Sequence, residues 1–158
     1  MTRTARCCCG DCTITVEGEP ILNGICHCTS CKPRTGSAFG WSAYFPDDKV
    51  TAKTGALNIY AKDGDAGYNR FFCARCGTTL YWKSFGFLPD ATGIAGGCFV
   101  DDPLPEPNFS AQDRDRAGQY AGRIRGRDAH PHAADVHRDS DSGSQRNADR
   151  RQRLRRHR

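Results

Sequence analysis

The chain has 158 residues, including ten cysteines and one methionine, and its formal net charge is +5. This length accommodates one domain and is too short for two to be expected. Residues 1–112 carry 10 Lys and Arg against 11 Asp and Glu, whereas residues 113–158 carry 13 Arg against 7 Asp. The total charge therefore gives no reason to expect nucleic acid as a partner of residues 1–112.

The high cysteine content has two common explanations, disulfide bonds and metal binding. Residues 1–6 lead directly into cysteines, without the apolar segment of a secretion signal. No run approaches the ~18 apolar residues that would indicate a membrane span. We therefore expect a cytoplasmic protein without a membrane partner, whose thiols are reduced and bind metal.

The first cysteines lie in the segment Cys-Cys-Cys-Gly-Asp-Cys at 7–12. In an extended Cys-x-Cys the side chains of Cys7 and Cys9 point to the same side. Gly10 permits the positive φ of a tight turn. Residues 13–17 then alternate polar and apolar, which predicts a strand with its apolar side chains facing inward.

The densest group of thiols is Cys-His-Cys-Thr-Ser-Cys at 26–31. This spacing allows Cys26, Cys28 and Cys31 to converge on one cation from a single short loop. Residues 32–37, which contain Pro and Gly, predict a continuing loop.

Further strands are predicted from aromatic and β-branched composition bounded by turn residues. These segments are 38–45, 50–53, 57–60, 68–72, 78–82 and 94–100. Thr54 and Gly55 predict a turn that pairs the segments 50–53 and 57–60. No segment before residue 112 has a sustained helical period, so the fold class is predicted to be mainly β.

Cys73 and Cys76 are separated by two residues and lie between two predicted strands, an arrangement typical of a zinc knuckle. Together with Cys7 and Cys9 they supply the four thiolates of a closed, structural site. Spacing alone leaves open which pair joins which.

The three central thiols then leave one position of a tetrahedral metal unfilled. Cys98, Cys8, Cys12 or His27 can close it, and Cys98 on a distant predicted strand is the best placed of them. If the position is open, a metal with three thiolates is a poor Lewis acid for making hydroxide. Such a site suits the binding of an incoming thiol as its nucleophilic thiolate.

Residues 113–158 have a different composition from the rest. Their large apolar residues are Tyr120, Ile124, Val136 and Leu154, too few to offset the entropy of ordering. We expect a disordered Arg-rich tail. Because it contains Arg without Lys or Glu, it also resembles a coding sequence read in a shifted frame.

The ordered motifs resemble the glutathione-dependent formaldehyde-activating enzyme family. They are C-x-C-G at 7–10, C-H-C-x-x-C at 26–31, T-G-S-x-F at 35–39 and R-x-F-C-x-x-C-G-T at 70–78. The resemblance covers about residues 5–111 and implies the Mss4-like, mainly β fold for a zinc-binding domain at 1–112.

The resemblance also implies a carbon–sulfur lyase that forms or cleaves S-(hydroxymethyl)glutathione, with glutathione and formaldehyde as small-molecule partners. Two Zn²⁺ per chain are implied, one structural and one catalytic. The structural zinc would be held by Cys7, Cys9, Cys73 and Cys76, and the catalytic zinc by Cys26, Cys28 and Cys31.

Two alternatives remain, because one fold can host unrelated functions. A zinc-stapled binding module needs the second metal to be closed or absent. A methionine-sulfoxide-type reductase needs a redox cysteine outside the metal groups, for which Cys98 or Cys12 is available.

Overall fold

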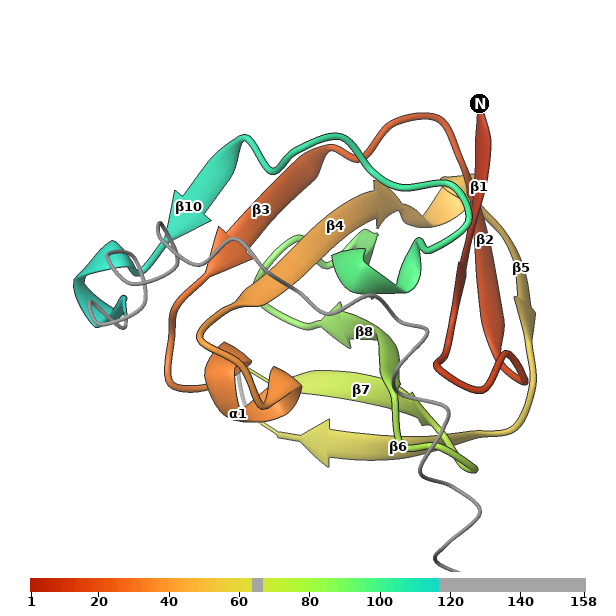
Figure 1. The fold of residues 1–158 in the computed structure, drawn as a ribbon, viewed down its shortest axis with the longest axis horizontal. Coiled ribbons are helices and arrows are strands. Elements are labelled where there is room, and N and C mark those ends of the chain that lie inside the picture. The colour runs from red at the N-terminus through yellow and green to blue at the C-terminus, as the bar shows by residue number, and fades with distance from the viewer. Residues whose placement is uncertain (64–66, 117–158) are drawn as a thin grey trace, which may run out of the picture. The chain divides into compact units, whose positions relative to one another are not determined.

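The computed structural model describes residues 1–63 and 67–116, and it consists mainly of β-strands with short loops (Figure 1). The predicted fold class is thereby confirmed. The strands are β1 (Thr2–Arg6), β2 (Thr13–Glu17), β3 (Leu22–Cys26), β4 (Gly40–Pro46), β5 (Val50–Thr54), β6 (Leu57–Lys62), β7 (Tyr68–Cys73), β8 (Thr79–Ser84), β9 (Ala91–Ala95) and β10 (Phe109–Ala111). The helical elements are α1 (Cys31–Thr35) and the 3₁₀ turns η1 (Asp47–Lys49), η2 (Gly96–Cys98) and η3 (Asp113–Asp115). In the described ranges, no helix has the length and apolar character that a membrane crossing requires.

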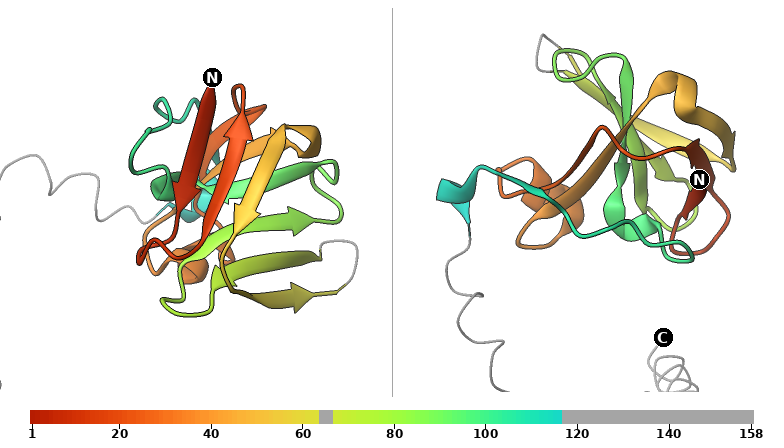
Figure 2. Two further views of the ribbon diagram at one scale, coloured as in Figure 1. Left: turned by 90° about the vertical axis from the view of Figure 1, so that its right-hand side faces the viewer. Right: turned by 90° about the horizontal axis from the view of Figure 1, so that it is seen from above.

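The strands form two sheets. A three-stranded sheet has the order β1-β2-β5 and is seen face on in the left view of Figure 2. A seven-stranded sheet has the order β10-β3-β4-β9-β8-β7-β6. Within the described residues, neighbouring strands are antiparallel except for β10, which lies parallel to β3.

The hydrophobic core contains side chains from both sheets. Ile14 and Val16 on β2 are fully buried, in agreement with the alternation of residues 13–17. They belong to one cluster with Phe45, Leu80 and Ile94 of the larger sheet. Each such side chain contributes about 1.5–3 kcal/mol through burial, so this cluster is a main source of the contact between the sheets.

The predicted pairing of residues 50–53 with 57–60 is wrong. Both segments are strands, but β5 pairs with β2 in the small sheet and β6 pairs with β7 in the large one. Gly55 between them has φ +87°, and a Cβ there would collide with the backbone of Asp11 and with Cys12. The Cys12 thiol donates to the carbonyl of Ala56 at 3.2 Å. These contacts hold the chain where it crosses from one sheet to the other.

Two other local predictions differ from the structure. The predicted strand at 94–100 ends at Ala95, where the chain turns into η2, and Gly96 at the start of this turn packs closely on the Trp41 indole. The predicted loop at 32–37 is mostly occupied by α1, which is followed by the C-cap residue Gly36 with φ +62°. Five residues are too few to produce a helical period in a sequence.

The C-terminal described segment lies along β3 (Figure 1), and the sequence did not predict this strand. In β10, Ala111 is paired in register with Cys26, and the His27 amide donates to the Ala111 carbonyl at 3.0 Å. The Lys32 ammonium donates to the backbone of Asp115 at 3.0 Å. The turn η3 thus lies within the range predicted as a tail. The rest of that prediction, including the shifted reading frame, concerns residues outside the described ones.

Replacing Gly55 by alanine is expected to destabilise the protein by about 1–3 kcal/mol or more, because the residue has a positive φ and no room for a Cβ. Urea unfolding of both proteins measures the difference. Gly97→Ala is the matched control, since a Cβ there meets nothing within 4 Å, and it should change stability by less than about 0.5 kcal/mol. Equal effects of the two substitutions would contradict this account of the crossing.

Candidate metal centre

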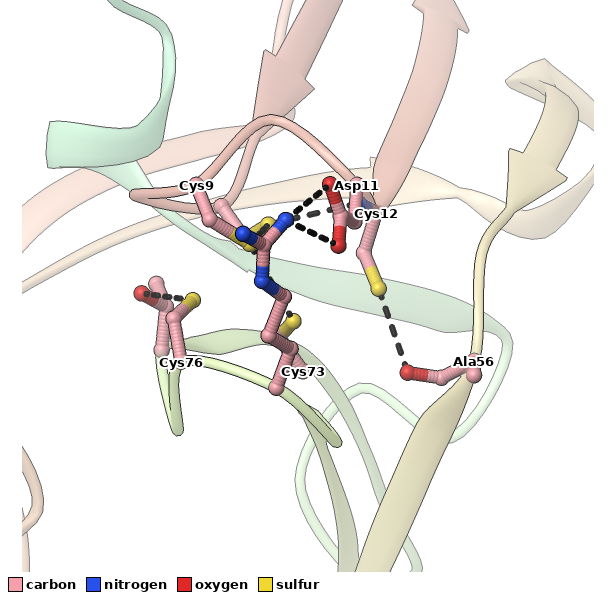
Figure 3. Close-up of polar contacts among 9 residues, drawn as sticks. Cys9, Asp11, Cys12, Ala56, Cys73 and Cys76 are labelled. Atoms are coloured by element: carbon pink, nitrogen blue, oxygen red, sulfur yellow. Dashed lines mark hydrogen bonds and ion pairs between the residues drawn. The ribbon is translucent and has the colours of Figure 1, made fainter.

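Four thiols from distant parts of the chain meet in one group. The sulfur atoms of Cys7, Cys9, Cys73 and Cys76 all lie within 4.8 Å of one another. The Cys7–Cys9 and Cys9–Cys73 sulfur distances are 3.5 and 3.7 Å. A tetrahedral zinc with bonds of 2.3 Å requires sulfurs about 3.8 Å apart, so the group has nearly the size of such a site. Figure 3 shows the thiols of Cys9, Cys73 and Cys76 converging.

Each pair of thiols lies at a hairpin turn. The first turn joins β1 to β2, and the Gly10 amide donates to the Cys7 carbonyl at 3.0 Å. The second joins β7 to β8, and the Gly77 amide donates to the Cys73 carbonyl at 2.9 Å. Both glycines have positive φ, +83° and +74°, a conformation that glycine adopts without strain. The glycine after the last thiol of each pair therefore lets the turn close.

The electrostatics of this group call for a cation. Hydrogen bonds from the side chain and backbone of Thr78 lower the pKa of Cys76 to about 5. At Cys9 a backbone hydrogen bond from Asp11 favours the thiolate, but burial and the neighbouring thiols together raise the pKa to about 12. Thiolates this close repel one another, so a bound divalent cation is needed for all four to ionise. The donor set fits zinc.

The second group is formed by Cys26, Cys28 and Cys31, whose sulfurs also lie within 4.8 Å of one another. Cys26 ends β3 and Cys31 begins α1, so a strand end and a helix start define the positions of the outer two. All three are half-buried. The predicted convergence from one short segment is therefore what the structure shows.

The three central thiols differ in their readiness to ionise. Burial raises the pKa of Cys31 to about 12. Burial also opposes ionisation of Cys28, but hydrogen bonds from the Cys31 and Ser30 amides outweigh it and lower the pKa; the Cys31 amide lies 3.3 Å from the sulfur. A bound cation would favour the thiolate form of all three thiols and so remove this difference between their pKa values. This group therefore also fits a thiophilic metal.

No further Cys, His, Asp or Glu of residues 1–63 and 67–116 joins either group. Cys98, which the sequence placed best to close the central group, lies buried in η2 with its sulfur 4.0 Å from the Thr79 carbonyl. Burial raises its pKa to about 11. The Cys12 thiol donates a hydrogen bond to the Ala56 carbonyl instead (Figure 3). Cys8 is exposed.

His27 is also directed away from the central thiols. Its ring is buried, with Nδ1 3.3 Å from the Ala38 carbonyl and Nε2 3.8 Å from a carboxylate oxygen of Asp113. The group therefore offers three thiols in the described part of the chain, one fewer than the four ligands of a closed tetrahedral site.

A cavity of about 600 Å³ lies between the residues that follow the central thiols and the second hairpin turn. Arg34, Phe39 and Trp41 line it together with Cys76 and Cys98, so the thiol group that it borders is the one at the two hairpin turns. Two further cavities of about 450 and 260 Å³ border neither thiol group. The cavity has the size typical of a small-molecule site.

The strand aromatics are expected from sequence to form core rather than a substrate surface. Phe45, Tyr81 and Trp82 are indeed buried. Trp41, in contrast, is half-buried and also lines the cavity. Its indole packs on Gly96, the first residue of η2.

Contacts made by two arginines near the central thiols were missed by sequence reasoning. Arg70 on β7 donates to the Ser30 hydroxyl at 2.8 Å and stacks on Tyr68, so it anchors the loop between Cys28 and Cys31. Arg34 extends from α1 over Trp82. These contacts join segments some forty or more residues apart, and no local spacing signals them.

Comparison with known proteins assigns the class. A family model described as "Glutathione-dependent formaldehyde-activating enzyme" matches residues 2–113. Because this match covers well over half of the chain, the protein belongs to that family.

The individual relatives are distant. A protein of Fusarium vanettenii is 28% identical over 104 residues, which cover 62% of this chain and 54% of the relative. One of Talaromyces marneffei is 27% identical over 104 residues with the same coverages. Both carry the provisional name glutathione-dependent formaldehyde-activating enzyme. The chain thus spans about half the length of the curated relatives it matches.

A solved structure supports the fold. The crystal structure of a Rhodobacter sphaeroides protein from a structural genomics programme superposes with a TM-score of 0.52 at 19% identity. The matched region covers 68% of this chain and 97% of the Rhodobacter sphaeroides chain. This similarity concerns the fold alone.

Cys73→Ser is expected to reduce the metal retained by the chain and to destabilise it, because it removes one ligand from the group that joins two hairpin turns. Elemental analysis and thermal unfolding of the purified protein measure both effects. Cys12→Ser is the control: this buried thiol lies close to the group but contacts Ala56, so metal content should stay unchanged. Equal metal loss in both variants would contradict the assignment of ligands.

Proposed function

We propose that this protein is a zinc-dependent carbon–sulfur lyase that acts on the adduct of glutathione and formaldehyde. The observation that carries the proposal is the unequal size of the two thiol groups, four members in one and three in the other. Membership of the family supports glutathione and formaldehyde as the small-molecule partners.

The proposed division of roles follows from ligand number. Cys7, Cys9, Cys73 and Cys76 would hold a structural zinc, whose four protein ligands leave no position for a substrate. The three central thiols would hold a second zinc with one position available. Two Zn²⁺ per chain are therefore proposed.

The reaction conserves oxidation state. In the direction of synthesis the glutathione sulfur forms a bond to the formaldehyde carbon, and the thiol proton ends on the formaldehyde oxygen. In the lyase direction the same carbon–sulfur bond breaks. A zinc with three thiolates would bind the incoming thiol as a thiolate that remains nucleophilic, which is the chemistry this step needs.

The chain's own residues would orient the thiol rather than supply a base. The contact of Arg70 with Ser30 keeps the loop of the central thiols in place, and the cavity beside α1 is large enough for a tripeptide. All ten cysteines are free thiols, which suits a reducing compartment, and we include the cytoplasm in the proposal.

The proposal predicts that the protein accelerates formation of S-(hydroxymethyl)glutathione from glutathione and formaldehyde. Exchange NMR at equilibrium measures this rate against the spontaneous one. Cys28→Ala should abolish at least about 90% of the acceleration, because it removes a ligand of the working metal. Cys12→Ser, which changes a thiol outside both groups and outside the cavity, should leave it intact.

This assay, together with an assay of methionine-sulfoxide reduction, separates the alternatives. No acceleration by the zinc-loaded protein would contradict the lyase and favour a zinc-stapled binding module. Reduction of a methionine sulfoxide that depends on Cys98 or Cys12 would favour a reductase.

The proposal also predicts two zincs per chain after purification without chelator. Conversion of all three central cysteines to serine should leave one zinc, because the four-thiol group is untouched. Elemental analysis of the two proteins checks the count. Two zincs in the triple variant would place the second metal elsewhere and contradict the proposal.

A further inference from the structure

The two most accessible thiols of the chain lie on the wall of one cavity. In the part of the chain that the structure describes, Cys8 and Cys76 are exposed, whereas the other eight cysteines are buried or half-buried. Both exposed thiols line the cavity of about 600 Å³. One comes from the turn between β1 and β2, and the other from the turn between β7 and β8. The fold therefore brings together two accessible thiols that are far apart in the sequence.

The Thr78 hydroxyl connects the two turns at this point. It accepts a hydrogen bond from the Cys8 amide at 3.2 Å and lies 3.2 Å from the Cys76 sulfur (Figure 3). A hydroxyl carries one proton, which remains available for donation to the Cys76 thiolate because the amide uses only a lone pair of the oxygen. The amide of the next residue, Cys9, also hydrogen-bonds to the Cys76 sulfur. The backbone on both sides of the Cys8 carbonyl is therefore held against the Cys76 side chain.

These two thiols differ in their relation to the candidate metal. Cys76 belongs to the four-thiol group at the hairpin turns, whereas Cys8 belongs to neither thiol group. An accessible thiolate that accepts hydrogen bonds is the form of cysteine that hydroperoxides oxidise. The resulting sulfenic acid condenses with a neighbouring free thiol. The structure supplies both parts of this reaction, the oxidisable thiolate and an uncommitted thiol beside it.

We propose that Cys76 and Cys8 form an oxidative modification site, in which a hydroperoxide oxidises Cys76 and Cys8 then closes a disulfide with it. In the first step the Cys76 sulfur attacks a peroxide oxygen, the O–O bond breaks and a sulfenic acid forms. In the second step the Cys8 sulfur attacks the sulfenic sulfur, the S–S bond forms and the S–O bond breaks. The two sulfurs lose two electrons in total. Hydrogen peroxide becomes two waters, which take up the proton of the Cys8 thiol and one proton from solvent.

The disulfide changes what joins the two hairpin turns. It removes one of the four thiols of the group, so the metal is held by three ligands and is lost more easily. The new covalent bond connects the same two turns that the metal would connect. Oxidation thus exchanges a metal cross-link for a covalent one. This site goes beyond the lyase reaction and does not depend on it.

Two other thiols could react with the sulfenic acid. The Cys9 sulfur lies within 4.8 Å of the Cys76 sulfur, but as a ligand of the same metal it is not free to attack. Cys98 also lines the cavity, but its side chain is buried and its sulfur lies 4.0 Å from the Thr79 carbonyl. Cys8 is therefore the thiol that is both free and accessible.

Peptide mapping of the zinc-loaded full chain after exposure to hydrogen peroxide tests the proposal. Free thiols are alkylated and the protein is digested with trypsin without reduction. Cleavage after Arg75 separates Cys73 from Cys76 and leaves Cys76 as the one cysteine of the peptide 76–83, while Cys8 lies in the peptide 7–34. We expect these two peptides to be linked, with fragmentation placing the bond at Cys8. A chromogenic chelator should report zinc release that keeps pace with the linked pair.

Cys8→Ser should bind as much zinc as the unaltered protein before oxidation, because Cys8 is outside both thiol groups. After peroxide treatment it should show complete loss of the linked pair, and Cys76 should proceed to sulfinic acid, which dithiothreitol does not reduce. The unaltered protein should regain its zinc after treatment with dithiothreitol and addition of the metal. Cys12→Ser is the matched control, since this buried thiol lies beside the group but donates to Ala56, and it should keep the linked pair.

Absence of the linked pair in the unaltered protein, or a bond from Cys76 to Cys9 or Cys98, would overturn the inference. An equal amount of linked pair in Cys8→Ser, or linkage without zinc release, would also overturn it. The mapping of the unaltered protein decides the question even if a variant folds poorly. Because no readout involves glutathione or formaldehyde, a failure of the lyase proposal would be seen in the NMR assay alone.

Discussion

The structure depends on the meeting of two hairpin turns that are far apart in the chain. One turn carries Cys7 and Cys9 and the other carries Cys73 and Cys76, so the four thiols join the small sheet to the edge region of the large one. Their sulfurs are nearer than four thiolates tolerate without a positive charge between them. Burial of side chains between the sheets acts over the same interface, and the two contributions fix the relative position of the sheets.

The central thiols are organised differently, because their positions come from one continuous segment. β3 ends at Cys26 and α1 begins at Cys31, and β10 pairs with β3 up to the first of these thiols. Pro33 lies within α1, where proline is tolerated in the first turn of a helix. The segment is therefore held at both ends, and the side chains that follow the last thiol are directed to fixed neighbours.

Much of the fold and of the thiol grouping was accessible from sequence, since alternation at 13–17 and the spacing of cysteines reflect local geometry. The partners of β5 and β6 were not accessible, because the crossing at Gly55 depends on contacts with Asp11 and Cys12. Spacing likewise could not decide whether Cys98 reaches the central group.

The environment of Arg34 was also beyond sequence reasoning. Its guanidinium depends on Trp82 and Gly40, residues brought beside it by sheet pairing and not by any repeat in the chain. A basic residue near a cysteine motif is common, and only the structure shows which residues this one contacts.

The thiols of the central group are close together along the chain, whereas those of the four-thiol group are far apart. The two groups therefore form at different times during synthesis. The central group is complete once six consecutive residues have been synthesised, whereas Cys9 must wait for Cys73, which lies 64 residues later. At a synthesis rate of about 5–20 residues per second this delay is roughly 3–13 s. During that interval Cys7 and Cys9 lie in a chain that does not yet contain the other two thiols of their group. The contact between the two hairpin turns therefore forms later than the grouping of the central thiols.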